Sequence, residues 1–154
     1  MKVFQDPVWQ AKLTAITQNY REGDIISHQK LNEIFGIEEP EFSDFENAIQ
    51  YKEALQSYQL VRMTLIERLK HDLLVGRQCY LDNVFGEGYR IVPAKDQAAT
   101  AYKKATRNIH SEFEDGRLAM DNIRQTALNA EEKRRTNDIV SKFALLQTLF
   151  ENNK

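Results

Sequence analysis

The sequence predicts a mostly α-helical protein of the α+β class, with one β-hairpin and a C-terminal antiparallel helical hairpin. Apolar residues recur at helical spacing along most of its 154 residues. Its 6 Gly and 3 Pro residues gather at the junctions between those stretches, whereas an all-β chain would spread them through many turns. A single pair of β-prone runs flanks a Gly-x-Gly turn, which predicts the hairpin.

The segment that ends at Gly36 predicts a helix, a short strand and a second helix. A helix is expected over residues 7–21, because Pro7 suits the first turn of a helix. Its apolar face consists of Trp9, Leu13, Ile16 and Tyr20. The two isoleucines at residues 25–26 predict a short strand. Ser27 is then the predicted N-cap of a short helix that ends with Gly36 as its C-cap.

A longer helix is expected from Ser43 to about Val75. Ser43 and Glu46 have the spacing of a capping box, in which each side chain satisfies the other residue's backbone N–H. A break near Gln56 stays open as an alternative, and Gly76 is the predicted end of the helix. The predicted apolar stripe consists of Ala54, Tyr58, Val61, Leu65, Leu69 and Leu73.

The β-hairpin is predicted to follow this helix. Residues 79–81 and 89–92 are the two β-prone runs, and residues 82–88 connect them through the Gly-x-Gly turn. Pro93 is expected to end the second strand, because proline lacks the N–H group that a strand ladder needs.

The remaining chain predicts two helices that fold back on each other. The first is expected to run from Asp96 to about Leu128, with Gly116 as a point of local weakness. Asn129 and Glu132 have the spacing of an N-cap pair that begins the second helix. The predicted domains are a first domain over residues 1–95 and the helical hairpin over residues 96–154.

Each arm of this predicted hairpin has one apolar stripe, so the hairpin must pack on the first domain, on a second copy or on a partner. Homodimerisation is the predicted role, and docking on the first domain is the alternative. The candidate oligomerisation residues are Ile109, Phe113, Ile139, Phe143, Leu146 and Phe150.

The order of the predicted elements resembles that of a winged helix-turn-helix domain, in which two helices support a third and the hairpin forms the wing. Residues 23–37, GDIISHQKLNEIFGI, look like the strand and second helix of that fold. Residues 85–91, FGEGYRI, are similar to the wing of winged-helix DNA-binding domains, including the effector domains of response regulators. This resemblance covers residues 9–93. With its helical tail, the chain also resembles small phage or prophage proteins.

The resemblance implies a non-catalytic transcriptional regulator that binds duplex DNA as a homodimer. The helix over residues 56–75 would occupy the recognition position, and the wing tip, residues 82–88, would approach the DNA backbone or minor groove. Glutamine can read adenine, and lysine can reach guanine or phosphate. The candidate DNA-binding residues are Gln56, Gln59, Arg62, Lys70, His71, Arg77 and Arg90.

Charge and apolar residues favour a second interpretation of the first domain, as a protein-interaction module. Through Lys95 the chain has 11 Lys and Arg residues against 14 Asp and Glu residues, a balance of −3. The face that would read DNA also carries Leu60, Met63 and Leu74, which are poor neighbours for phosphate. A phage-type module of this kind would dock on a host enzyme or defence complex and inhibit it. A structural role in a helical assembly is a third interpretation.

Composition excludes several other classes. One cysteine, Cys79, cannot form an internal disulfide framework or a cysteine-based zinc site. The three histidines, His28, His71 and His110, lack the spacing of metal ligands. No catalytic constellation is recognisable, so we expect a non-enzyme without cofactor, metal or small-molecule substrate. No apolar run has the length of a membrane span and the first residues do not resemble a signal peptide, so we expect a cytoplasmic protein.

Overall fold

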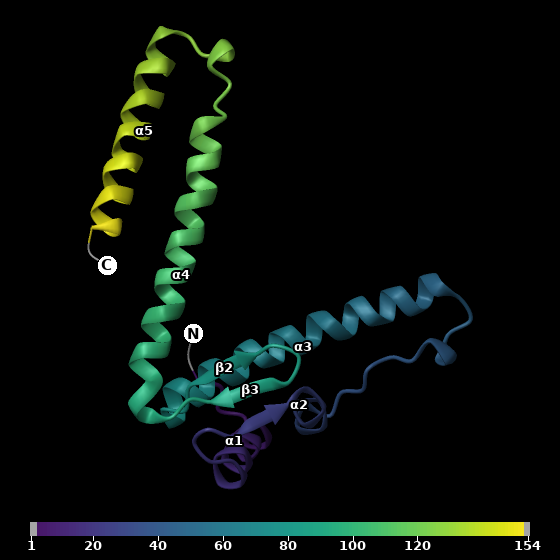
Figure 1. The fold of residues 1–154 in the computed structure, drawn as a ribbon. Helices are drawn as coiled ribbons and strands as arrows, with labels where there is room; N and C mark the ends of the chain where they lie inside the picture. The colour runs from purple at the N-terminus through teal and green to yellow at the C-terminus, as the bar shows by residue number, and fades with distance from the viewer. Residues whose placement is uncertain (1–2, 153–154) are drawn as a thin grey trace. The chain divides into compact units, whose positions relative to one another are not determined.

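A computed structural model describes residues 3–152, and Figure 1 shows their helices and strands. In chain order they are α1 (Pro7–Asn19), β1 (Ile25–Ser27), α2 (His28–Phe35), the short 3₁₀ helix η1 (Phe42–Asp44), α3 (Ala48–Arg77), β2 (Leu81–Val84), β3 (Gly88–Ile91), α4 (Ala94–Asp121), the short 3₁₀ helix η2 (Gln125–Ala127) and α5 (Ala130–Glu151). The chain divides into two compact units, unit 1 over Met1–Thr100 and unit 2 over Ala101–Lys154. The predicted boundary after residue 95 falls slightly earlier, in the first turn of α4.

The predicted β-hairpin is confirmed, and the short strand β1 joins it to make a three-stranded antiparallel sheet in the order β1-β3-β2. The strand β2 begins two residues later and ends three residues later than predicted, because residues 82–84 pair in it and the turn is correspondingly shorter, whereas β3 lies one residue earlier than predicted. The geometry of this sheet explains why residue 88 is a glycine. A Cβ atom at Gly88 would lie 2.0 Å from the carbonyl oxygen of Ile26, so only glycine lets β1 pair this closely with β3.

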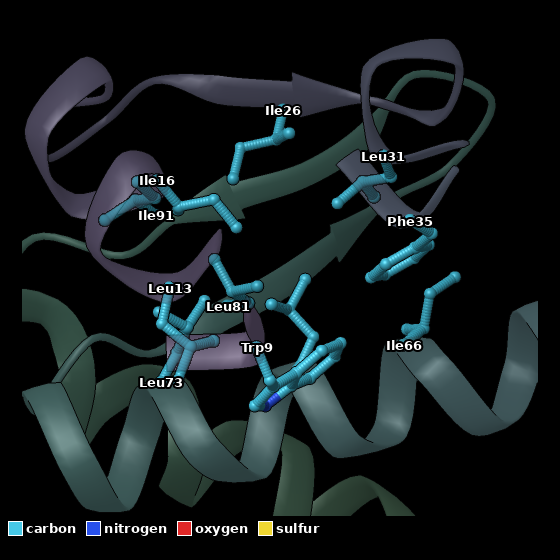
Figure 2. Close-up of a cluster of buried hydrophobic side chains, with 11 residues drawn as sticks. Trp9, Leu13, Ile16, Ile26, Leu31, Phe35, Ile66, Leu73, Leu81 and Ile91 are labelled. Atoms are coloured by element: carbon cyan, nitrogen blue, oxygen red, sulfur yellow. The ribbon is translucent and has the colours of Figure 1, made fainter. Parts of the chain in front are cut away.

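The core of unit 1 lies between the sheet and helices α1, α2 and α3, as Figure 2 shows. Its members are Trp9, Leu13, Ile16, Ile26, Leu31, Phe35, Ile66, Leu69, Leu73, Leu81 and Ile91. The rings of Trp9 and Phe35 stack with their centroids 6.3 Å apart. Full burial of one such side chain stabilises a fold by roughly 1.5–3 kcal/mol, so this cluster holds three helices and the sheet together.

The predicted caps of α2 and α5 are confirmed. The Ser27 hydroxyl accepts a hydrogen bond from the backbone N–H of Lys30, and Gly36 ends α2 in the left-handed conformation with φ of 71°. Asn129 and Glu132 form a reciprocal capping box at the start of α5. These are local interactions, which explains why a short sequence pattern is enough to predict them.

The predicted start of α3 is wrong. Its N-cap is Asn47, whose side chain accepts hydrogen bonds from the backbone N–H groups of Ile49 and Gln50. Ser43 lies instead in η1, where Phe42 and Phe45 both pack on the ring of Tyr51. This aromatic contact turns the chain before α3 begins, so Ser43 and Glu46 never form a capping box.

The predicted end of α3 and its core-facing stripe also need correction. The helix is unbroken through Gln56 and continues past Gly76 to Arg77, where Gln78 takes the left-handed conformation with φ of 52°. Its buried residues are Ile66, Leu69, Asp72 and Leu73. Val61 is exposed, because the helix extends beyond the core at its N-terminal half and has nothing to pack against there.

The predicted helical hairpin is confirmed in unit 2, where α5 runs back along α4 (Figure 1). The helix α4 ends at Asp121, earlier than predicted. Gly116 is a packing position rather than a break in the helix, because a Cβ atom there would lie 2.7 Å from the ring of Phe143. The rings of Phe143 and Phe150 both contact Phe113, at centroid distances of 5.7 Å and 5.5 Å.

The candidate oligomerisation residues do not share one environment. Phe113, Phe143 and Phe150 pack between α4 and α5 and are half-buried. Ile139 and Leu146 lie outside that contact and are 55% and 58% exposed. No described residue of α4 or α5 is fully buried. Within residues 3–152, no helix combines the length and the hydrophobicity that a membrane span requires.

Candidate functional site

The outward face of α3 carries several large apolar side chains that are exposed to solvent. Leu60 and Met63 are 67% and 64% exposed, and Leu74 is also exposed. Residues seven apart lie on one side of a helix, which places Ile49, Gln56 and Met63 in one row and Leu60, Glu67 and Leu74 in the next. We call these six residues the outward face of α3.

The two glutamines predicted to read bases project to solvent. Gln56 and Gln59 are both exposed, and both lie in the part of α3 that extends away from the core. Lys70 is less accessible, because its Nζ lies 2.9 Å from the Oε1 of Glu67 and 5.8 Å from the centre of the Tyr89 ring. The carboxylate of Glu67 therefore competes with any phosphate for this lysine.

Arg62 links α3 to α2 instead of projecting outward. Its Nε donates a hydrogen bond of 3.2 Å to the side-chain oxygen of Asn32, and its Nη2 donates one of 2.7 Å to Nδ1 of His28. Burial and the positive charge of Arg62 lower the pKa of His28, which keeps that imidazole neutral and able to accept the bond. Asn32 in turn donates to the hydroxyl of Tyr58 at 2.7 Å, so this network holds α2 against α3.

His71 is held by a buried carboxylate that the sequence analysis did not identify. Its Nδ1 lies 2.8 Å from Oδ1 of Asp72, which has no exposed surface. Asp72 also accepts hydrogen bonds from the Trp9 indole at 2.9 Å and from the Phe4 backbone N–H at 3.2 Å. Burial tends to raise the pKa of Asp72, but the bonds from His71, Trp9 and Phe4 outweigh it and lower the pKa.

Arg77 and Arg90 complete the predicted DNA-binding set. Arg77 donates hydrogen bonds to the Thr14 hydroxyl at 3.1 Å and to the Gln10 side-chain oxygen at 3.4 Å, so it packs along α1. Arg90 is half-buried in β3, opposite Asp82 in the sheet register. The seven predicted residues therefore lie on different sides of unit 1 and do not form one basic surface.

The tip of the hairpin exposes an aromatic ring. Phe85 is 97% exposed and precedes Gly86, whose positive φ of 76° makes the tight turn. The turn is bordered by Asp82 and Glu87, and residues 82–88 contain no Lys or Arg. A bare phenylalanine beside two carboxylates is better suited to an apolar pocket than to a phosphate backbone.

Acidic side chains surround the hollow between α2 and the connector that leads to α3. Its volume is about 840 Å³, and four carboxylates line it, those of Glu33, Glu38, Glu39 and Glu41. A smaller hollow of about 470 Å³ lies beside it, against Tyr58 and Gln59 of α3. This side of unit 1 therefore presents negative charge next to the exposed half of α3.

Cys79 and His110 lie outside the surfaces described above. Burial and the nearby Glu22 carboxylate raise the pKa of Cys79, which disfavours the thiolate. His110 lies 3.3 Å from Glu114 on the surface of α4. Between residues 3 and 152, no three His, Cys, Asp or Glu residues gather closely enough to hold a metal ion.

The site is therefore a surface: an exposed apolar helix face with two exposed glutamines beside it, and an acidic hollow between α2 and the connector. No protein-family model, curated protein or solved structure matches this chain.

Proposed function

We propose that this chain is a non-catalytic protein-interaction module that docks the outward face of α3 into an apolar groove on another protein, where it blocks that surface. One observation carries the proposal: the apolar side chains of this face are free, whereas most of the basic side chains predicted for DNA are tied to neighbours within the chain. Leu60 and Met63 are more than 60% exposed, while Arg62, His71 and Arg77 each bond to a residue of the same fold.

The spacing of the apolar residues fits recognition of a helix by a groove. Docked helices use anchors three, four and seven residues apart, and Leu60, Met63 and Leu74 have separations built from these steps. Each large apolar anchor contributes roughly 1.5–3 kcal/mol when it is fully buried. The N-terminal half of α3 extends beyond the core, so a partner can approach it without clashing with the sheet.

The charges near this face define the partner further. The hollow between α2 and the connector that leads to α3 is lined by Glu33, Glu38, Glu39 and Glu41, and unit 1 as a whole is acidic. A groove with Lys and Arg residues around its rim would complement this surface, increase the association rate and make that rate sensitive to salt. The partner that we propose is therefore a protein with an apolar groove and a basic rim.

Duplex DNA binding by a winged helix-turn-helix domain is the second candidate. The order of the helices, the β1-β3-β2 sheet and the free side chains of Gln56 and Gln59 support it. On this proposal α3 enters the major groove, and a homodimer places two copies of α3 on adjacent half-sites. The acidic surroundings of α3 weaken the case, because phosphate contacts need clustered cations.

Photo-crosslinking separates the two candidates. A photoreactive amino acid replaces Met63 in one variant and, as a matched control, the exposed Gln18 of α1 in another. We expect position 63 to capture the same protein repeatedly from a bacterial lysate, and position 18 not to capture it. Leu60→Glu, added to the position 63 variant, should abolish that capture because it places a charge in the apolar contact.

Fluorescence anisotropy with a random duplex DNA at low salt tests the second candidate, DNA binding. The double substitution Gln56→Ala and Gln59→Ala could weaken DNA binding while Leu60→Glu leaves it unchanged. That result would support DNA recognition and contradict the protein-interaction proposal. Capture at position 63 that persists in the Leu60→Glu variant would contradict the proposed docking face.

A further inference from the structure

We propose that the smaller hollow, which α2, the connector and α3 border, binds a free amino acid with a polar side chain. Arg62 binds the carboxylate of this ligand, and Glu39 binds its ammonium group. The volume of the hollow is about 470 Å³, which lies within the range of small-molecule sites. The inference does not rest on the proposed function, because neither residue belongs to the outward face of α3.

Two helices place matched pairs of polar side chains at this hollow. His28 and Asn32 are four residues apart on α2, and each borders the hollow. Tyr58 and Arg62 are likewise four residues apart on α3 and border it from the other side. Hydrogen bonds donated by Arg62 and Asn32 join the two pairs. The polar groups are therefore held in position before a ligand arrives.

Arg62 retains free hydrogen-bond donors. A guanidinium has five N–H groups, and Arg62 uses one on the Asn32 side-chain oxygen and one on Nδ1 of His28. Both partners are neutral, because burial and the charge of Arg62 lower the pKa of His28. Among residues 3–152, no carboxylate forms an ion pair with Arg62. A half-buried guanidinium that is fixed by two bonds and lacks a counter-ion is well suited to bind a carboxylate.

Tyr58 supplies a second donor beside Arg62. Its hydroxyl oxygen accepts a hydrogen bond of 2.7 Å from the side-chain nitrogen of Asn32. In the part of the chain that the structure describes, the O–H proton of Tyr58 has no acceptor of its own. Because Tyr58 lies one turn before Arg62, a single negatively charged group in the hollow can accept from both residues.

Glu39 determines what else the ligand must carry. This carboxylate borders the same hollow from the connector, but it forms no ion pair with Arg62 or with any other described residue. It repels a simple anion such as phosphate and attracts an ammonium group. A molecule that carries both charges has a partner at each end, and a free amino acid is such a molecule.

The rest of the lining favours a polar side chain on the ligand. The side-chain amides of Gln29 and Gln59 border the hollow, and none of the described residues that line it is aliphatic. An amide can both donate and accept hydrogen bonds, so these two residues fit a ligand amide better than a hydrocarbon chain. L-glutamine is therefore a suitable probe for the site.

Calorimetric titration with L-glutamine and two analogues tests the inference. The amine γ-aminobutyramide lacks the carboxylate of L-glutamine, and glutaramic acid lacks its ammonium group. We expect each analogue to bind at least about tenfold more weakly, because each leaves one charged side chain without its partner. The NMR signal of the His28 imidazole, followed in the same titrations, reports whether the ligand binds beside Arg62.

Two carboxylate variants locate the ammonium contact. Glu39→Gln should weaken L-glutamine binding at least about tenfold, because it removes the charge that holds the ammonium group. The same variant should not weaken the binding of glutaramic acid, which has no ammonium group to lose. Glu38→Gln is the matched control, because Glu38 borders only the larger hollow, and it should change L-glutamine binding less than about twofold.

Arg62→Gln tests the carboxylate contact and should weaken both L-glutamine and glutaramic acid. Its urea midpoint shows whether unit 1 stays folded, and Glu39→Gln, on the exposed connector, keeps the inference testable if it does not. A His28 signal that none of the twenty common amino acids moves at about 10 mM would overturn the inference. Equal losses in Glu39→Gln and Glu38→Gln, or tighter binding of inorganic phosphate than of L-glutamine, would also overturn it.

Discussion

The two units differ in how much of their apolar surface they bury by themselves. Unit 1 encloses a cluster of eleven hydrophobic side chains between three helices and a sheet, with Leu13, Leu69 and Leu73 almost completely removed from water. Unit 2 is a hairpin in which no described residue is fully buried. Unit 1 can therefore be stable through its own core, whereas unit 2 has no comparable core. Regular helices alone do not make an independent fold.

The largest expected effect is on the core of unit 1. Leu73→Ala removes a side chain with no exposed surface and should lower the free energy of unfolding by about 2–5 kcal/mol. The matched change in unit 2 is Leu146→Ala, at a position that is 58% exposed, and it should change the unfolding of unit 1 by less than about 0.5 kcal/mol. Urea denaturation followed by the fluorescence of Trp9, the only tryptophan, reports unit 1 specifically.

Equal losses of stability in these two variants would contradict the difference between the two units. They would mean that the core of unit 1 does not unfold independently of the hairpin.

The buried carboxylate of Asp72 gives the next largest effect and a pH dependence. Asp72→Asn should destabilise unit 1 by about 1–3 kcal/mol, because an amide cannot accept the bonds from Trp9, Phe4 and His71 equally well. The pKa of Asp72 is lowered in the folded state. Its stabilising contribution is therefore fully present above the unfolded pKa of about 3.9 and is lost as the pH falls through the lower folded pKa.

Urea midpoints of the wild type and Asp72→Asn between pH 6 and pH 3 check this prediction. The midpoint difference between the two proteins should shrink toward acidic pH. Asp44→Asn, at an exposed position of η1, is the matched control and should leave the profile unchanged. A constant difference across the range would show that the charge of Asp72 does not contribute.

A smaller effect is expected inside the hairpin. Gly→Ala in a helix usually stabilises by up to about 1 kcal/mol, but at Gly116 the new methyl group would lie 2.7 Å from the Phe143 ring. Gly116→Ala should therefore destabilise the hairpin by roughly 1 kcal/mol through overpacking. Thermal melts followed by circular dichroism measure the stability of Gly116→Ala, Phe143→Ala and the double variant, which together form a double-mutant cycle. Gly116→Ala should become stabilising once Phe143 is removed, and a stabilising effect with Phe143 present would contradict the packing.

The smallest expected effect concerns the network between α2 and α3. Burial and the charge of Arg62 lower the pKa of His28, so a neutral His28 stabilises the fold and this contribution is lost as the pH falls below about 6.5. Arg62→Ala should raise the pKa of His28 toward its ordinary value. Titration of the imidazole by NMR measures the shift directly, and an unchanged pKa would rule out the contact between these side chains.

The sequence could predict those features that depend on interactions between residues close together in the chain. Ser27, Gly36 and Asn129 act through backbone groups within a few residues of themselves, and the helix ends predicted from them are confirmed. The start of α3 was predicted wrongly because Ser43 has the right local pattern, while the deciding contact is that of Phe42 and Phe45 with Tyr51. A local motif is thus overridden by packing.

The candidate site shows the same limit. Helical periodicity correctly leaves Gln56, Leu60 and Met63 exposed, since it needs no knowledge of distant residues. The contact of Arg62 with His28 joins residues 34 positions apart, and that of Asp72 with Trp9 joins residues 63 positions apart. No short pattern encodes such pairs, so the sequence could not show that Arg62 and His71 have hydrogen-bond partners within unit 1.

Hydrogen exchange of the full chain tests the contrast between the units most directly. We expect amides of residues 101–152 to exchange much faster than amides of α3 near Leu69 and Leu73, because only the latter lie beside a buried core. A hairpin whose protection is as high as that of the core would contradict this contrast, because unit 2 would then be as stable as unit 1 without a core of its own.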